Sequence, residues 1–175
     1  MTPGGSVREL DPYVLALPEG DGLVTAQQLD EIERRALEND RGRCRILLHG
    51  EPSDSLHEMV IAVAGRPYIA PHINRRSAKS FLVLRGEMLV ILFEPDGQLA
   101  GHRSLAAGDG ERAFMLRLGT PRFHTIVPVT TSVVFIETAA GAHEATPYAD
   151  WAPAADGSAD AQAYWAGVLT AVGLG

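Results

Sequence analysis

The chain has 175 residues, which is the length of one domain with a full hydrophobic core. Hydrophobic residues make up 46% and charged residues 21% of the sequence, which argues against wholesale disorder. The formal net charge of −7 argues against a nucleic-acid backbone or an anionic membrane surface as the main partner. The one cysteine, Cys44, excludes an internal disulfide and a thiolate-cluster zinc site, and we expect it to be a small buried residue in a strand.

Residues 1–24 are dense in proline and glycine, so they predict an irregular arm with one short strand at 13–17. This stretch lacks a basic region followed by an apolar core, and no part of the chain reaches the apolar length of a spanning helix. We therefore expect a cytoplasmic protein. Thr25, followed three residues later by Gln28, forms a capping box that predicts a helix to about residue 39.

From residue 43 onward the turn signals are those of an all-β protein. Two hairpins are predicted, one at Arg85-Gly86 and one at EPDGQ over 94–98. Eight or nine short strands at this spacing predict a sandwich or barrel. The predicted strands cover residues 43–49, 57–64, 67–70, 79–84, 87–93, 98–105, 113–118, 124–128 and 132–138.

After the last predicted strand the sequence is rich in alanine, proline and glycine, which predicts an ordered loop lying over the barrel. We expect Tyr148 and Trp151 to hold this loop in place, because their rings are costly to leave in water. Ser158 begins a final helix that ends near Val172. The expected organisation is an arm (1–24), a main domain with its N-terminal helix (25–157) and a helix packed on the barrel (158–175).

Two histidines mark the candidate site. His72 and Asn74 are two residues apart, so on an extended strand both side chains point to one face. His124 follows a Gly-Thr-Pro turn in GTPRFHTIV, just before another strand-like run. Two histidines that lie far apart in sequence, each at the lip of a strand, predict a site in the mouth of a small β-barrel.

The stretch PHIN(x)4KSFLVLRGE resembles the first cupin motif, and GTPRFHTIV resembles the second. Among cupins the resemblance is to the WbuC-type cupin-fold metalloproteins. Further marks of this resemblance are RGR, EMVIAVAGRPYIAPH, FLVLRGEMLVILFEPDG and FIETAAGAHEATPYADWAP. It implies a jelly-roll barrel that holds one divalent metal through three histidines and a glutamate. Such relatives often lie among genes for surface polysaccharide synthesis, which implies an activated sugar or another polar metabolite as the ligand.

The resemblance places His72 at the first histidine and His124 at the histidine of the second motif. Asn74 replaces the second histidine, and Lys79 stands where the glutamate belongs. His72, Asn74 and His124 are therefore the metal-ligand candidates, for Zn, Fe, Ni or Mn. We expect metal binding to be weak or absent if Lys79 points into the site, because an ammonium repels a divalent cation.

Lys79 leaves two alternatives open. Pointing inward, its charge takes the electrostatic role of the metal while His72 or His124 moves a proton, so that all three are catalytic candidates. Pointing outward, the long stem leaves the ammonium in water and a metal still binds. Two further side chains are candidates to complete a metal site, His57 and Glu137.

Three more residues are substrate-binding candidates together with Asn74. Arg41 and Arg43 either bind an anionic ligand group or serve a surface role. His49 either lines the site or makes a structural hydrogen bond. The predicted function is that of a WbuC-like cupin enzyme of the isomerase, epimerase or lyase type, with a small-molecule site in its barrel. The alternative is a non-catalytic ligand-binding or structural cupin, and in both cases we expect a homodimer formed through exposed sheet edges.

Overall fold

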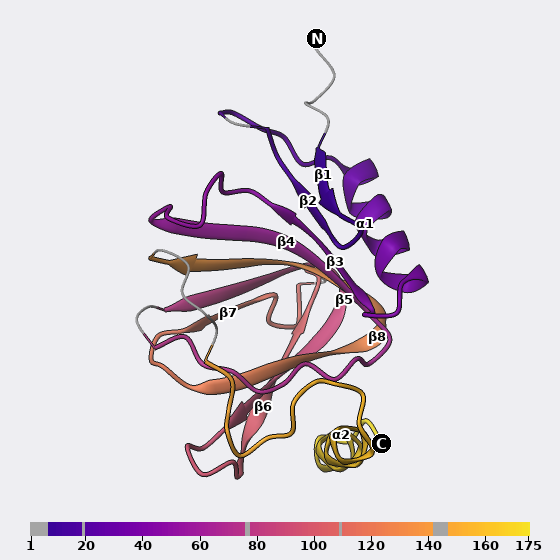
Figure 1. Ribbon diagram of the computed structural model, residues 1–175, viewed down its shortest axis with the longest axis vertical. Helices are drawn as coiled ribbons and strands as arrows, with labels where there is room; N and C mark the ends of the chain where they lie inside the picture. The colour runs from indigo at the N-terminus through magenta and orange to yellow at the C-terminus, as the bar shows by residue number, and fades with distance from the viewer. Residues whose placement is uncertain (1–6, 19, 76–77, 109, 142–146) are drawn as a thin grey trace.

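The structure is a computed structural model that describes residues 7–18, 20–75, 78–108, 110–141 and 147–175. The all-β class with one helix before and one after the main strands is confirmed (Figure 1). None of the helices in this part of the chain is long and apolar enough to cross a membrane. The elements are β1 Arg8–Asp11, β2 Val14–Ala16, α1 Ala26–Glu38, β3 Arg43–Leu47, β4 Leu56–Ala64, β5 Lys79–Phe93, β6 Leu99–Ala106, β7 Met115–Leu118, β8 Phe123–Ala140 and α2 Ala159–Ala171.

Two long strands, β5 and β8, organise the sheet. They pair antiparallel along their whole length, from Lys79 opposite Ala139 to Phe93 opposite Phe123. On its other edge, the first half of β5 pairs with β7 and the second half with β6. The second half of β8 pairs with β4, and β3, β2 and β1 follow. Because β5 and β8 both bend in the middle, the sheet folds into two facing layers (Figure 1). The first layer contains β1 to β4, β7, the first half of β5 and the second half of β8, and the second layer contains β6, the second half of β5 and the first half of β8.

The predicted hairpin at Arg85-Gly86 is wrong, because β5 continues through these residues as one bent strand. Its register to β8 shifts on both sides of Gly86, which has a φ of 74°. A Cβ at Gly86 would lie 2.4 Å from the carbonyl oxygen of Ser132, so only glycine fits this bend. The local sequence signal is the same for a bulge and for a turn, since both use a glycine with positive φ.

Other boundaries also differ from the expectation. The strands predicted at 124–128 and 132–138 are parts of the continuous β8, and residues 67–70 form no strand. The short strand predicted at 13–17 is confirmed as β2, whereas β1 was not predicted; together they extend the first layer beyond β3. The hairpin at 94–98 is confirmed, with the amide of Glu94 donating to Gln98 O at 2.9 Å.

The helix predicted from Thr25 is confirmed together with its capping box. The Thr25 hydroxyl accepts a hydrogen bond from the Gln28 amide, and the Gln28 side chain accepts one from the Thr25 amide at 2.7 Å. Ile32 and Ala36 are the buried residues of α1 and pack in one cluster with Cys44 of β3. The expectation that Cys44 is buried in a strand is therefore confirmed.

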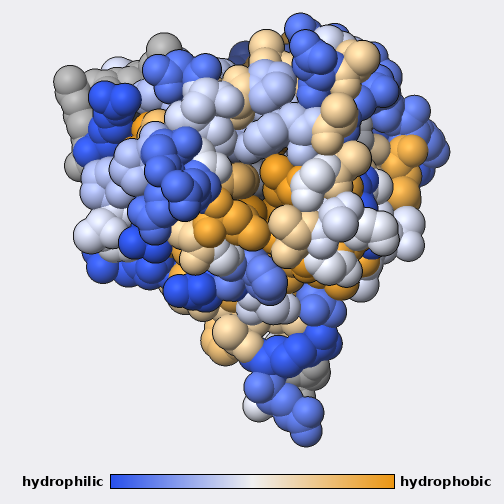
Figure 2. All heavy atoms as spheres, turned by 90° about the horizontal axis from the view of Figure 1, so that it is seen from below, coloured by the Kyte–Doolittle hydropathy of each residue, from blue (hydrophilic) through white to orange (hydrophobic). Residues whose placement is uncertain are grey.

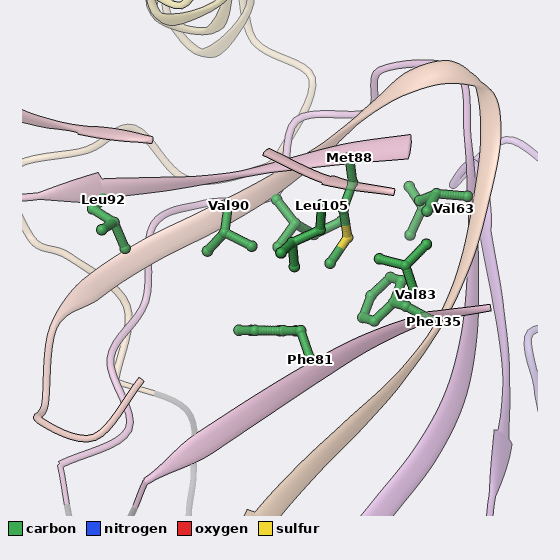
Figure 3. Packing of buried hydrophobic residues seen from close by; sticks show 10 residues of the cluster. Val63, Phe81, Val83, Met88, Val90, Leu92, Leu105 and Phe135 are labelled. Carbon is green, nitrogen blue, oxygen red and sulfur yellow. The ribbon is translucent and has the colours of Figure 1, made fainter. Parts of the chain in front are cut away.

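The main hydrophobic core lies between the two layers. Figure 3 shows Phe81 of β5 pointing into the space that Val90 and Leu105 fill from the opposite layer. Each large apolar side chain buried here contributes about 1.5–3 kcal/mol to the free energy of folding. The buried members of the cluster are Val63, Phe81, Val83, Met88, Val90, Leu92, Leu105, Ile126, Val133 and Phe135.

The C-terminal helix α2 packs on the outer side of the second layer. Trp165 clusters with Leu89 and Ile91, and its indole N–H donates to the carbonyl of Arg66 at 2.7 Å. Trp151 joins this cluster, so its expected role in holding the loop is confirmed, whereas Tyr148 is 64% exposed. Seen from below, hydrophobic atoms gather near the middle of the molecule between more hydrophilic regions (Figure 2).

Candidate functional site at the open end of the layers

The candidate site lies where the two layers are open. Because β5 bends back, its first residue and its last residues lie at the same end of the molecule. Lys79 and Glu137 reach this end from the first layer, and His124 reaches it from the second. Phe81, whose ring centroid lies 5.8 Å from that of His124, closes the site on the side of the core.

His72 and His124 lie side by side. The amide of His72 donates to His124 O at 3.0 Å, and the amide of His124 donates to His72 O at 2.9 Å. This short bridge adds the segment before His72 to the edge of β8, and the ring centroids lie 4.5 Å apart. The expected convergence of the two rings is therefore seen.

Backbone carbonyls fix the protonation pattern of both rings. Nδ1 of His72 lies 3.1 Å from Ala70 O, and Nδ1 of His124 lies 2.9 Å from Arg122 O. A carbonyl oxygen can only accept, so each Nδ1 carries the hydrogen and each Nε2 carries a lone pair. Nε2 of His124 is buried and has no hydrogen-bond partner within the described segments. The pair thus offers two basic nitrogens to the site.

Lys79 is the single lysine of the chain, and it points inward. Its side chain is 9% exposed, and Nζ lies 3.1 Å from Oε1 of Glu137, which is 15% exposed. Nζ also lies 5.9 Å from the centroid of the Phe81 ring. The alternative in which the ammonium stays in water is therefore wrong, since the long stem carries the charge against the core and into an ion pair.

This burial keeps both imidazoles neutral. Loss of water around the ring, followed by the charge of Lys79, lowers the pKa of His72, and Glu137 opposes that effect. Burial, then the neighbouring His72 and Lys79, holds the pKa of His124 well below its ordinary value. At neutral pH the site therefore contains two neutral imidazoles beside one buried ion pair.

The space at the histidines is small, but a larger cleft adjoins it. A cavity of about 10 Å³ is lined by Asn74, Lys79, Leu118, Thr120, Arg122 and His124. The neighbouring cleft has a volume of about 210 Å³ and shares Leu118, Thr120 and Arg122 with that cavity. The small cavity holds about one water molecule, so the body of any larger ligand has to occupy the cleft.

The other substrate-binding candidates lie in different surroundings. The guanidinium of Arg41 lies over the ring of Tyr13 at 4.1 Å, a contact that accounts for this residue without a ligand. Arg43 of β3 carries a charge that contributes to the lowered pKa of His72, after the larger effects of burial and Lys79. Nδ1 of His49 contacts Glu58 O at 3.0 Å, which is the structural hydrogen bond expected as the alternative.

Asn74 lines the small cavity together with Lys79 and His124. His57, considered as a completing ligand, instead lies with its ring centroid 4.2 Å from that of His49, and its Nε2 is 3.2 Å from Pro52 O. Glu137, the other such candidate, does reach the site, where it pairs with Lys79.

The donor set does not fit a divalent metal in this arrangement. The described residues contain no group of three or more His, Cys, Asp or Glu side chains that could hold one. The two Nε2 atoms are suitable ligands, but the carboxylate beside them is neutralised by Lys79 at 3.1 Å. A cation placed among these groups would meet the ammonium of Lys79 at close range, and this repulsion opposes its binding.

The sequence reasoning missed three residues of this region. Tyr148 pairs through its backbone with His72, and the ring centroids of the two residues lie 6.2 Å apart. Arg103 and Arg122 line the cleft. Alternation along the strands is the signal that could have found them, because Arg103 is two residues before the core residue Leu105 and Arg122 is two residues before His124.

Comparison with known proteins supports the fold. A family model described as a domain of unknown function (DUF6016) matches residues 24–105. Among solved structures, oxalate oxidase in complex with the substrate analogue glycolate is 15% identical with a TM-score of 0.50, covering 64% of this chain and 57% of its own. The recombinant pro-11S globulin of pumpkin is 16% identical with a TM-score of 0.50, covering 63% of this chain and 29% of its own.

These neighbours have the cupin jelly-roll fold, and this protein shares it. The chain spans less than two thirds of the length of the neighbours named above, and the low identity makes the likeness one of fold alone. No protein with a curated description matches the sequence.

Proposed function

We propose that this protein is a WbuC-like cupin whose barrel mouth binds a small polar metabolite and moves a proton on it without a divalent metal. The observation that carries the proposal is the buried ion pair of Lys79 and Glu137 beside two neutral imidazoles. In a metal-dependent cupin a cation would supply positive charge at this point. Here the ammonium of Lys79 supplies it.

The residues divide the chemistry between them. Nε2 of His124 or His72 accepts a proton from the ligand, since each ring holds its own hydrogen on Nδ1. The ammonium of Lys79 stabilises the negative charge that develops on a neighbouring ligand oxygen. Phe81 keeps water away on the core side, which strengthens both interactions. Removal of a proton next to a carbonyl is the first step of isomerisation, epimerisation and many lyase reactions.

A second candidate is a cupin that binds its ligand without changing it. The small size of the cavity at the histidines, about 10 Å³, favours this alternative, because a reacting atom has little room beside Nε2 of His124. The lowered pKa of His124 points the same way, since it makes the imidazole a weaker base. The two candidates share the same site and the same charge arrangement.

Metal titration tests the charge arrangement directly. Protein purified without a metal-binding tag is titrated with Zn²⁺ and with Mn²⁺ by calorimetry, as wild type, Lys79→Gln and Lys79→Glu. We expect no stoichiometric binding by the wild type and clear binding by Lys79→Glu, which combines two carboxylates with two imidazoles. Lys79→Gln is the matched control, because it removes the charge without adding a ligand. Tight stoichiometric binding by the wild type would contradict the proposal.

The single lysine provides a test of ligand binding. Protein labelled with ¹⁵N at lysine and histidine gives one side-chain ammonium signal, that of Lys79, beside the ring-nitrogen signals of the histidines. We expect a small polar carbonyl compound that binds at the mouth to shift this signal together with the Nε2 signals of His72 and His124. A compound that binds the protein and shifts none of them would place the ligand site elsewhere.

A further inference from the structure

The cleft of about 210 Å³ opens between the edge strands of the two layers. β7 pairs with the first half of β5 and β6 pairs with the second half, and no pairing joins β6 to β7 in the part of the chain that the structure describes. The layers therefore part at this edge. Leu92, Leu116 and Leu118 line the cleft, and three arginines line it as well, Arg103, Arg117 and Arg122.

Two of these arginines follow the alternation of inward-facing residues, Arg103 within β6 and Arg122 directly before β8. Arg103 shares the inner face of β6 with Leu105, a member of the main core. Arg122 shares its face with His124, and its carbonyl receives the Nδ1 hydrogen of that histidine. Arg122 lines both the cleft and the small histidine cavity, so it joins the two spaces.

The described residues around the cleft give it a positive charge. No acidic residue is among the lining residues that the structure describes. Within the same part of the chain, Arg117 and Arg122 form no ion pair, and the guanidinium of Arg103 donates to a backbone carbonyl, that of His102, at 2.9 Å. A chain with a net charge of −7 thus concentrates three positive charges at one opening. Such a concentration attracts and orients an anion.

We propose that this cleft binds the phosphate group of the ligand, so that the metabolite is a phosphate ester or diphosphate. The inference rests on the proposed function, because it places the anion on the Arg122 side of the histidine pair. A guanidinium presents parallel N–H groups that match two phosphate oxygens, and two or three such groups suit a doubly charged anion. The cleft, at about 210 Å³, is far larger than the cavity of about 10 Å³ beside the histidines, so it is the space that has room for a phosphate with a short carbon chain.

The probes are inorganic phosphate and pyrophosphate, titrated into the full chain by calorimetry and followed by ³¹P NMR. The variants are Arg103→Gln/Arg122→Gln and, as a control of equal charge change, Arg8→Gln/Arg34→Gln on β1 and α1. We expect the wild type and the control to bind pyrophosphate alike. The cleft variant should bind about tenfold more weakly for each arginine removed, since each loses charge-assisted hydrogen bonds.

Three results would overturn the inference. They are the absence of phosphate and pyrophosphate binding to the wild type, equal binding by the cleft variant, and equally tight binding of succinate, a dicarboxylate of similar charge. Pyrophosphate binding that is lost in Lys79→Met but kept in the cleft variant would move the anion to Lys79. That result would refute the phosphate cleft but not the proposed function, because the metal titration and the ammonium signal of Lys79 test the proposed function independently.

Discussion

The molecule contains two pairs of neighbouring histidines, and they differ in what their nitrogens face. The rings of His49 and His57 lie 4.2 Å apart, even closer than the 4.5 Å of His72 and His124. In the first pair one ring nitrogen of each histidine contacts a backbone carbonyl, Nδ1 of His49 at Glu58 O and Nε2 of His57 at Pro52 O. In the second pair both Nδ1 atoms do so, and Nε2 of His124 is buried without a hydrogen-bond partner among the described residues, in a cavity that Lys79 also lines. Closeness alone therefore does not make a site, whereas an unused Nε2 beside a buried charge does.

The two histidine pairs differ most clearly in the buried charge beside them. The ion pair of Lys79 and Glu137 lies beside the second histidine pair. Burial lowers the pKa of His72 and of His124, the charge of Lys79 adds to that effect at both, and Glu137 opposes it at His72. An ion pair that is removed from water stabilises little by itself, because desolvation offsets the attraction. Its presence in a small core therefore agrees with a role in function more than in stability.

The largest expected effect comes from breaking this pair on one side. Glu137→Gln leaves the ammonium of Lys79 buried without its carboxylate, and we expect a loss of about 3–5 kcal/mol in the free energy of unfolding. Urea denaturation at pH 7.5 measures it. The double variant Lys79→Met/Glu137→Leu should lose far less, since it removes both charges together. A surface control, Glu38→Gln on α1, should cost less than about 1 kcal/mol, because its partner Arg34 is exposed. A loss in Glu137→Gln no larger than in the control would show that the ammonium reaches water.

The next effect in size is a dependence of stability on pH. The pKa values of His72 and His124 are lowered in the folded protein relative to about 6.5 in the unfolded chain. Below that value the unfolded state binds more protons than the folded state, so stability is full above about pH 6.5 and falls as the pH drops. The fall is at most about 1.4 kcal/mol per pH unit for each histidine.

Urea midpoints measured between pH 7.5 and pH 5 test this prediction. His72→Gln/His124→Gln should flatten the slope, whereas His49→Gln/His57→Gln should leave it in place. A slope that is unchanged in the first variant would mean that other groups cause it. The charged neighbours that contribute at the site, Lys79, Glu137 and Arg43, are the same in all of these variants, so the comparison reports on the histidines.

The sequence predicted the fold and the histidine pair more completely than the rest of the site. The cupin fold, the two helices and the positions of His72 and His124 follow from local patterns and motif positions. The bend at Gly86 was mistaken for a hairpin, because a glycine of positive φ serves both. The pairing of Lys79 with Glu137 could not be predicted, because the two residues lie 58 positions apart in the sequence (79 to 137). A lysine side chain at position 79 can also point either into the barrel or out into water. Whether a charged residue faces the core depends on its partner across the sheet.

The smallest expected effect concerns the pair that serves the structure. Replacing His57 by glutamine removes the contact of its Nε2 with Pro52 O and its packing on His49, so we expect a loss of about 1 kcal/mol in stability. The ammonium signal of Lys79 and the binding of pyrophosphate should not change, because neither cavity is lined by His49 or His57. His124→Gln is the matched variant in the other pair, and it should shift the ammonium signal, since its Nε2 faces the small cavity that Lys79 also lines. If His57→Gln shifted the signal as much as His124→Gln, the two pairs would belong to one connected site, and the distinction between a structural and a functional histidine pair would fail.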